Sequence, residues 1–243
     1  MTRKINDYSG RIIIALDTPT ENEALALINR LENQVKFVKI GMELFYGTGF
    51  KFIEKIKSLG LKVFLDLKMH DIPNTVAGAS AQLTRLEVDM FNLHAAGGLK
   101  MMEAAAESVT KVLTAGQEKP LLIAVTQLTS TDEKMLRDEI GINLSMEDSV
   151  LNYAKMTKKA GLDGVVSSPL EVKKIKENIG RDFLTVTPGI RPKGTSTDDQ
   201  KRVTTPKEAF ELGSDFIVIG RAVTKVKEPA KVIENIIDDL KNT

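Results

Sequence analysis

The chain has 243 residues, of which 42% are hydrophobic, enough to bury the core of one barrel or one large α/β domain. Lys and Arg number 34 against 33 Asp and Glu, which argues against a broad surface for nucleic acid or an anionic membrane. The absence of cysteine excludes disulfides, thiolate metal sites and thiol nucleophiles. The first apolar run, Ile12 to Leu16, is too short for a signal sequence or a membrane span, so we expect a soluble cytoplasmic protein.

Short apolar runs alternate with stretches of helical periodicity along the chain, which is the pattern of repeated βα units around a parallel sheet. The predicted strands, in chain order, are 11–17, 37–41, 62–68, 90–94, 121–126, 164–167, 183–187 and 216–220. The predicted helices are 19–31, 49–58, 75–86, 99–114, 146–160, 170–178, 206–212 and 229–240. Eight such units in about 250 residues are typical of a (β/α)8 TIM barrel. We therefore predict one barrel domain over residues 1–243, with its active site where the strands end.

The first helix carries a recognisable start signal. Thr18 is a candidate N-cap, Pro19 is suited to the first helical position, and Glu21 lies three residues after the cap. Together these residues match a capping box, so we predict that the helix begins at Pro19.

The predicted third strand ends in charged residues, which is unusual for an apolar barrel strand. Asp66 and Lys68 close the strand, and Asp71 follows on the loop. Because side chains alternate along a strand, Asp66 and Lys68 point to the same side, which in a barrel can be the interior mouth. For an isolated Asp-x-Lys, the alternative is a buried ion pair that only fixes the strand.

Neighbouring strand ends favour a functional site over that alternative. Predicted strand one ends at Asp17, and predicted strand two carries Lys39, so consecutive strands bring ionisable groups to the same rim. Four neighbouring charges of alternating sign are typical of a preorganised electrostatic site.

The segment 66–75, Asp-Leu-Lys-Met-His-Asp-Ile-Pro-Asn-Thr, resembles the signature of the orotidine 5'-monophosphate decarboxylases of bacteria. Four further blocks, 38–41, 128–130, 187–192 and 219–221, are similar to the family's other motifs and occur in the family's order. Asp-x-Lys-x-x-Asp alone is shared by a wider superfamily of sugar-phosphate enzymes, whereas the whole set is specific. The resemblance implies a cofactor-free enzyme that converts orotidine 5'-monophosphate to UMP, the last step of de novo pyrimidine nucleotide biosynthesis.

Carried over by position, the resemblance implies a catalytic array of four residues. Lys68 would protonate C6, the pyrimidine carbon that loses CO2, and Asp66 would lie near the departing carboxylate. Lys39 and Asp71 would complete the array. A lysine held among carboxylates stays an ammonium, so Lys68 can serve both as a cation and as a proton source. Without a cofactor to act as an electron sink, such fixed charges must stabilise the electron pair left on C6.

The resemblance also implies residues that contact the substrate or a partner subunit. In the family, the residues matching Asp71, Ile72 and Thr75 extend into the neighbouring active site, which implies a homodimer with shared sites. The remaining implied substrate-binding positions are Asp17 and Lys39 at the ribose, Thr129 and Ser130 at the pyrimidine, and Arg191 and Gln200 in or beside the loop after strand seven.

The loops after predicted strands seven and eight are where barrels commonly bind phosphate. Gly220 and Arg221 follow strand eight, and Arg221 can offer phosphate a charge-assisted fork. The alternative for Arg221 is a solvated surface charge. The polar stretch Arg191 to Arg202 follows strand seven, and we predict that it is a mobile lid that closes over the phosphate and excludes water.

Two other functions are compatible with the barrel. One is a metal-dependent enzyme similar to 3-keto-gulonate-phosphate decarboxylase, in which a carboxylate at the end of strand two helps to hold Mg²⁺. This chain has Lys39 there, which argues against a metal. The other is a phosphosugar-binding or regulatory barrel without turnover, which the intact set of charges argues against. His70 and His94 lack the spacing of a metal pair. His70 does not match a catalytic position of the family, and we interpret His94 as a hydrogen-bonded wall residue rather than a general base.

Overall fold

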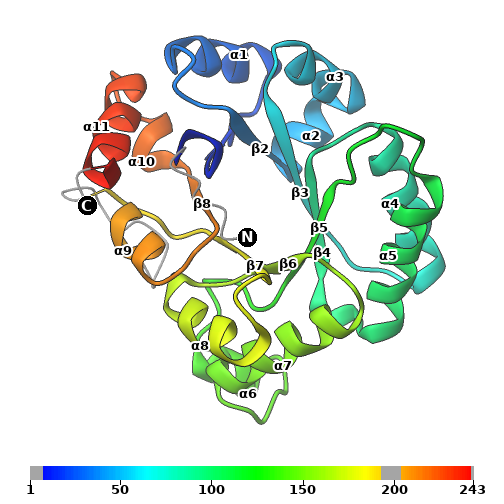
Figure 1. Cartoon of the computed structure of the whole chain (residues 1–243). Helices are drawn as coiled ribbons and strands as arrows, with labels where there is room; N and C mark the ends of the chain where they lie inside the picture. The colour runs from blue at the N-terminus through cyan, green and yellow to red at the C-terminus, as the bar shows by residue number, and fades with distance from the viewer. Residues whose placement is uncertain (1–7, 193–203, 242–243) are drawn as a thin grey trace.

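The structure is a computed structural model that describes residues 8–192 and 204–241. Eight parallel strands form a closed barrel, in which each strand pairs with the next along the chain and β8 pairs with β1. The helices surround the barrel on its outside (Figure 1). The predicted fold class, a (β/α)8 TIM barrel, is therefore confirmed.

The described elements follow one another as strand and helix around the ring. The strands are β1 (Ile12–Ala15), β2 (Phe37–Gly41), β3 (Lys62–Met69), β4 (Met90–His94), β5 (Leu121–Val125), β6 (Gly164–Val166), β7 (Leu184–Thr187) and β8 (Phe216–Ile219). The α-helices are α1 (Glu21–Arg30), α2 (Met42–Thr48), α3 (Phe50–Ser58), α4 (Pro73–Arg85), α5 (Leu99–Val112), α6 (Glu133–Asp138), α7 (Met146–Lys159), α8 (Pro169–Ile179), α9 (Pro206–Glu211), α10 (Arg221–Thr224) and α11 (Pro229–Lys241). Short 3-10 turns are η1 (Tyr8–Gly10) and η2 (Ala95–Gly97). Within the described ranges, no helix is long and apolar enough to cross a membrane.

The apolar residues of the strands form two layers, one inside the barrel and one beneath the helices. The inner cluster consists of Ile13, Ala15, Phe37, Phe64, Met90, Ile123, Val186 and Val218. Burying an aromatic side chain such as Phe64 contributes about 1.5–3 kcal/mol relative to leaving it exposed. Because side chains alternate, the next interior positions on β2 and β3 are Lys39 and Asp66. Polar side chains thus replace apolar ones at the carboxyl end of the barrel, which is where a site can form.

Helix α1 begins two residues later than predicted. Its N-cap is Thr20, whose side chain accepts a hydrogen bond from the backbone N–H of Glu23 at 3.3 Å. The predicted cap at Thr18 is therefore wrong. The sequence repeats the Thr-x-x-Glu pattern two residues further on, and the second copy caps the helix, with Thr20 in the extended conformation that is typical of an N-cap.

The connection between β2 and β3 contains two helices where one was predicted over residues 49–58. Helix α2 precedes α3, and Gly49 between them adopts a left-handed φ of 70° that breaks the helical path. The short helices α6 and α10 were also not predicted. Each has six residues or fewer, too short to show a helical period in the sequence.

Three aspartates tie strands together at the amino end of the barrel. Asp89, Asp163 and Asp215 each immediately precede an even-numbered strand, β4, β6 and β8. Each accepts a backbone N–H from the strand before it and an ammonium from a lysine. The partners are Val63 (2.8 Å) and Lys57 (2.8 Å) for Asp89, Leu122 (2.8 Å) and Lys119 (2.9 Å) for Asp163, and Thr185 (2.7 Å) and Lys176 (2.6 Å) for Asp215. These strand-start aspartates lie at the opposite end of the barrel from Lys39 and Asp66.

Candidate active site

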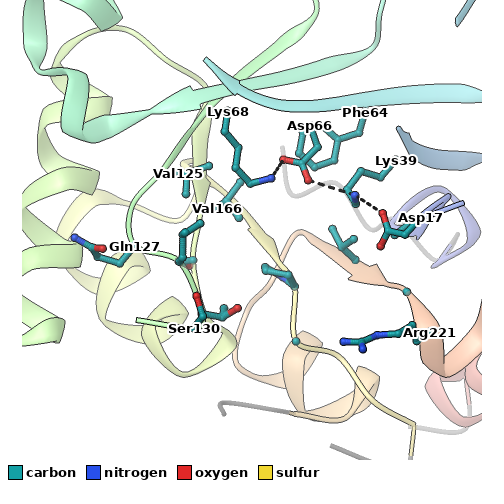
Figure 2. Close-up of a pocket in the computed structure, with 18 of the residues that line it drawn as sticks. Asp17, Lys39, Phe64, Asp66, Lys68, Val125, Gln127, Ser130, Val166 and Arg221 are labelled. Atoms are coloured by element: carbon teal, nitrogen blue, oxygen red, sulfur yellow. Dashed lines mark hydrogen bonds and ion pairs between the residues drawn. The ribbon is translucent and has the colours of Figure 1, made fainter. Parts of the chain in front are cut away.

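A cavity of about 320 Å³ opens at the carboxyl ends of the strands. Its wall carries nine of the predicted site residues, namely Asp17, Lys39, Asp66, Lys68, Thr129, Ser130, Arg191, Gly220 and Arg221. Figure 2 shows the charged residues of β2 and β3 along one side of this cavity and Arg221 across from them. The floor is apolar and includes Phe64, Val125, Val166 and Val218. An anionic, partly aromatic ligand matches this combination of charged wall and apolar floor.

Four charged side chains form a continuous chain of alternating sign in this cavity. The Lys39 ammonium lies 3.0 Å from Asp17 Oδ1 and 3.4 Å from Asp66 Oδ2. The Lys68 ammonium lies 2.8 Å from Asp66 Oδ1. Both oxygens of Asp66 are thus engaged by cations, as the dashed lines in Figure 2 show.

Burial and charge act in opposite directions on the central pair of this chain. Burial by itself lowers the pKa of Lys39, but the carboxylates of Asp66 and Asp17 outweigh it, and the pKa is raised. Burial raises the pKa of Asp66, but the charges of Lys39 and Lys68 and its hydrogen bonds leave the pKa below its usual value. Both residues are therefore charged at neutral pH, although their side chains are only 11% and 12% exposed.

Lys68 has an unusual backbone conformation for a residue in a strand. Its φ is 54°, in the left-handed region, which costs a non-glycine residue about 1–3 kcal/mol and is often found at functional sites. The pairing of β3 with β4 shifts register between Leu65 and Met69, on either side of Lys68. This bulge turns the end of β3, and the Lys68 ammonium meets Asp66 at the cavity wall.

Three predicted residues that follow β3, Asp71 and Ile72 on the loop and Thr75 in the first turn of α4, do not line the cavity of their own chain. Asp71, Ile72 and Thr75 are exposed, and the Asp71 carboxylate accepts the backbone N–H of Ile72 at 2.6 Å. Ile72 is 67% exposed, a high value for an isoleucine. Within one subunit, the array therefore contains Asp17, Lys39, Asp66 and Lys68 without Asp71.

Described residues that follow β7 and β8, among them Arg191 and Arg221, also line the cavity. Arg191 is only 7% exposed, and one of its guanidinium nitrogens donates to the carbonyl of Ile190 at 3.1 Å. Gly220 and Arg221 stand where β8 gives way to α10. Gln200 and most of the predicted lid, residues 193–202, lie outside the described residues.

Sequence reasoning missed several residues of the site. Gln127 and Ser167 line the cavity, and Asn92 lies behind it, hydrogen-bonded to both Asp66 and the backbone of Lys68. The signal for Asn92 was a lone polar residue in the apolar run Met90 to Leu93. That signal is the same kind of anomaly that marked Asp66.

The two histidines pack against each other beside the array. The rings of His70 and His94 are 5.6 Å apart between centroids. Burial, followed by the charges of His70 and Lys68, lowers the pKa of His94. Among the described residues, no group of three or more His, Cys, Asp and Glu side chains is placed to hold a metal ion.

The arrangement can stabilise negative charge that develops close to Lys68. Its ammonium is a proton donor, and it is fixed by a carboxylate that is itself held by a second ammonium. Such preorganised charges cost little reorganisation during a reaction. The cavity is also lined by hydroxyl, amide and guanidinium groups that can orient a polar ligand.

Comparison with known proteins gives the same family along the whole barrel. Residues 10–236 match the sequence model of the orotidine 5'-phosphate decarboxylase / HUMPS family. Orotidine 5'-phosphate decarboxylases from Bacillus mycoides (strain KBAB4) and Bacillus cytotoxicus are each 51% identical over 228 residues, 94% of this chain and 96% of each relative. The crystal structure of orotidine 5'-phosphate decarboxylase from Lactobacillus acidophilus superposes with a TM-score of 0.85 at 44% identity, covering 95% of this chain and 99% of that one. The chain therefore belongs to the orotidine 5'-phosphate decarboxylase / HUMPS family.

Proposed function

We propose that this enzyme decarboxylates orotidine 5'-monophosphate to UMP and so acts in pyrimidine nucleotide biosynthesis. The observation that carries the proposal is the chain of alternating charges from Asp17 through Lys39 and Asp66 to Lys68 at the cavity wall. Decarboxylase relatives at 51% identity support the reaction itself.

Lys68 is the proton donor in the mechanism that we propose. The bond between C6 and the carboxylate breaks, CO2 leaves, and the bonding electron pair stays on C6. A proton then passes from the Lys68 ammonium to C6, which completes UMP and leaves a neutral amine that solvent protonates again. The positive charge of Lys68 stabilises the electron pair before the proton moves.

Asp66 and Lys39 hold this donor in place. Asp66 accepts a hydrogen bond from Lys68 at 2.8 Å and is itself paired with Lys39, so its charge is balanced from both sides. The side chain of Asp17 is 50% exposed, and together with Lys39 it can bind the ribose hydroxyls. The lysine at the proposed reaction centre therefore belongs to a rigid network that extends to the sugar.

The phosphate site is proposed at Arg221 and Gly220, with Arg191 beside them and Gln200 in the loop after β7. Arg191, Gly220 and Arg221 line the same cavity as Lys68, and Figure 2 shows Arg221 across it from the Lys68 side chain, whereas Gln200 lies outside the described residues. Barrels commonly bind phosphate in these two loops. Binding energy from this remote group can contribute to catalysis by fixing the pyrimidine against Lys68, with Thr129 and Ser130 at the ring.

Lys39 also separates this proposal from a metal-dependent decarboxylase. Its ammonium already bridges the carboxylates of Asp17 and Asp66, at 3.0 and 3.4 Å. A divalent cation would have to displace it or stand beside its like charge. We therefore expect the reaction to proceed without a metal.

The deciding experiment follows loss of the orotate chromophore in enzyme that has been incubated with EDTA and dialysed. We expect full activity, and recovery only on adding Mg²⁺ would favour the metal-dependent alternative. An enzyme that binds UMP but shows no turnover under any condition would favour the binding-protein alternative.

A homodimer with shared active sites is the assembly that we propose. Four large apolar side chains are exposed on the segments that follow β2 and β3, namely Met42 (43%), Tyr46 (74%), Phe50 (48%) and Ile72 (67%). Exposed apolar groups of this size are characteristic of interfaces. Asp71, next to Ile72, is then available to complete the array of a partner subunit. A chain without cysteine needs no oxidising compartment, and we place the dimer in the cytoplasm.

Subunit complementation tests the shared site. Lys68→Ala and Asp71→Ala are each expected to lose nearly all activity as homodimers, because each removes one member of every site. After mixing and subunit exchange, a hybrid has one intact site if the sites are shared, so about a quarter of wild-type activity returns in an equal mixture. If Asp71 acts within its own subunit, no activity returns.

A further inference from the structure

Asn92 is a buried polar residue on β4 that none of the proposed roles uses. It is 1% exposed, and its neighbours in the strand, Phe91 and Leu93, are fully buried. An amide offers two N–H donors and a carbonyl acceptor, and burying them without partners costs free energy. The partners that Asn92 has are therefore informative.

Both ends of the Asn92 amide are bonded to the catalytic array. Its Nδ2 donates to Asp66 Oδ1 at 2.7 Å, and its Oδ1 accepts the backbone N–H of Lys68 at 2.8 Å. A carboxylate can only accept and an N–H can only donate, so these partners allow one orientation of the amide. Asp66 Oδ1 also receives the Lys68 ammonium at 2.8 Å.

The bulge at the end of β3 explains why a side chain makes these bonds. Leu65 pairs with Phe91 and Met69 with Leu93, so β3 takes four steps (69 − 65) where β4 takes two (93 − 91). Two extra residues are therefore accommodated in β3. The Lys68 N–H, displaced from the regular ladder, is bonded by the Asn92 side chain instead.

We propose that Asn92 is a positioning residue for the decarboxylation, an inference that rests on the proposed function. It holds Lys68 at its backbone, where φ is 54°, and holds the carboxylate that anchors the Lys68 ammonium. One buried side chain thereby fixes the backbone of Lys68 directly and its ammonium through Asp66. Asn92 does not itself line the cavity and acts only through Lys68 and Asp66, which do.

A merely structural Asn92 would contribute stability and nothing to the chemical step. The two roles differ in what they predict for kcat. Misplacing a reacting group by about 1 Å costs on the order of 100-fold in rate. A structural role changes the fraction of folded enzyme and leaves the turnover of each folded site unchanged.

The test compares Asn92→Ala and Asn92→Asp with the control Thr185→Val. Thr185 is fully buried and donates to Asp215 at 3.0 Å, so its replacement also removes a buried hydrogen bond from a barrel strand, but at the far end from the cavity. Turnover of orotidine 5'-monophosphate is expressed per folded site, with folding measured by circular dichroism and site integrity by UMP binding.

For Asn92→Ala we expect kcat to fall on the order of 100-fold, with KM and UMP affinity within about 3-fold of wild type. Thr185→Val should lose stability and keep kcat.

Asn92→Asp is nearly isosteric, so it preserves packing if Asn92→Ala folds poorly. It keeps an acceptor for Lys68 and places a second carboxyl against Asp66, with Lys68, Lys39 and His94 as the other titratable groups nearby. A proton shared between the new carboxyl and Asp66 replaces the lost N–H donor. The kcat of Asn92→Asp relative to that of wild type should therefore rise as the pH falls.

Two results would overturn the inference. One is a kcat per folded site equal to wild type in Asn92→Ala, or in Asn92→Asp where only that variant folds. The other is an equal loss of kcat in Thr185→Val, which would make the effect one of general stability. A wild-type enzyme without turnover refutes the proposed function instead, so the two failures are distinguishable.

Discussion

Replacing Lys39 with methionine tests the electrostatics of the array directly. Methionine keeps much of the side-chain length and volume of lysine but removes the ammonium. Asp66 then loses the cation at 3.4 Å from its Oδ2 but keeps Lys68 at 2.8 Å and Asn92 at 2.7 Å. The variant therefore leaves a carboxylate, 12% exposed, with one of its two oxygens unpaired.

The expected loss of stability follows from that geometry. Removing one partner of a buried ion pair typically costs about 3–5 kcal/mol, and the bonds that Asp66 retains place this case at about 3 kcal/mol. For a chain of 150–250 residues, 1 kcal/mol corresponds to about 2–4 °C in Tm. The midpoint of Lys39→Met should therefore fall by about 6–12 °C at neutral pH.

The loss should also depend on pH in a defined direction. The folded pKa of Asp66 is lowered, so its contribution is present above the unfolded value of about 3.9 and is lost as the pH falls through the folded pKa. The folded pKa of Lys39 is raised, so its contribution is present below about 10.4 and is lost as the pH rises through the folded pKa. The difference between wild type and Lys39→Met is then constant near neutrality and shrinks in acid.

Urea unfolding followed by circular dichroism at fixed protein concentration measures this difference, since the chain has no tryptophan to report by fluorescence. Lys57→Met is the matched control, because Lys57 pairs with Asp89 at 2.8 Å but is 30% exposed and lies at the far end of the barrel. The side chains of Lys57 and Asp89 are 30% and 16% exposed, against 11% and 12% for Lys39 and Asp66, so the control pair is less buried and its loss should cost less. The reasoning is refuted if Lys39→Met loses no more stability than Lys57→Met, or if its loss stays constant as the pH falls from neutrality to the acid limit of the folded state.

Three further substitutions test the site. Lys68→Ala should lower kcat by about 100- to 10,000-fold with the fold intact, and a near-normal kcat would remove it as proton donor. Arg221→Ala should raise KM by roughly 10- to 100-fold, as expected for a lost charge-assisted hydrogen bond, whereas an unchanged kcat/KM would place the phosphate elsewhere. Gly41→Ala should lower kcat about 10-fold, because its Cβ would lie 3.0 Å from the Lys39 ammonium and displace it. Gly78→Ala, whose Cβ has no atom within 4 Å, is the control, and equal kcat in both alanine variants would contradict this reading.

Much of the barrel could be predicted from the sequence because its strands are short apolar runs separated by helices. The eight strands were found for this reason, and the charged residues Asp66 and Lys68 stood out against an apolar background. The break at Gly49 was missed because a glycine in a helical pattern does not reveal whether its φ is positive.

The missing part of the site depends on contacts between strands. The role of Asn92 depends on a bulge in β3 that leaves the Lys68 N–H beside its side chain. No local sequence pattern predicts this bulge, so the contact could not be predicted either. The position of Asp71 outside its own cavity depends on how the loop after β3 leaves the barrel. Periodicity and motif spacing carry no information on either arrangement.

The strand-start aspartates indicate where new chain termini could be placed in a circular permutant of this barrel. Asp89, Asp163 and Asp215 tie β3 to β4, β5 to β6 and β7 to β8, so each bond joins an odd strand to the even strand that follows it. The corresponding position before β2 is Lys36. New termini placed before β3, β5 or β7 leave each tied pair within one continuous segment, whereas termini between the members of a pair divide it. Because β1 and β8 lie side by side, the ends of the native barrel can be joined in a circular permutant. Permutants opened before β3, β5 or β7 should keep more of the native stability than those opened within a tied pair.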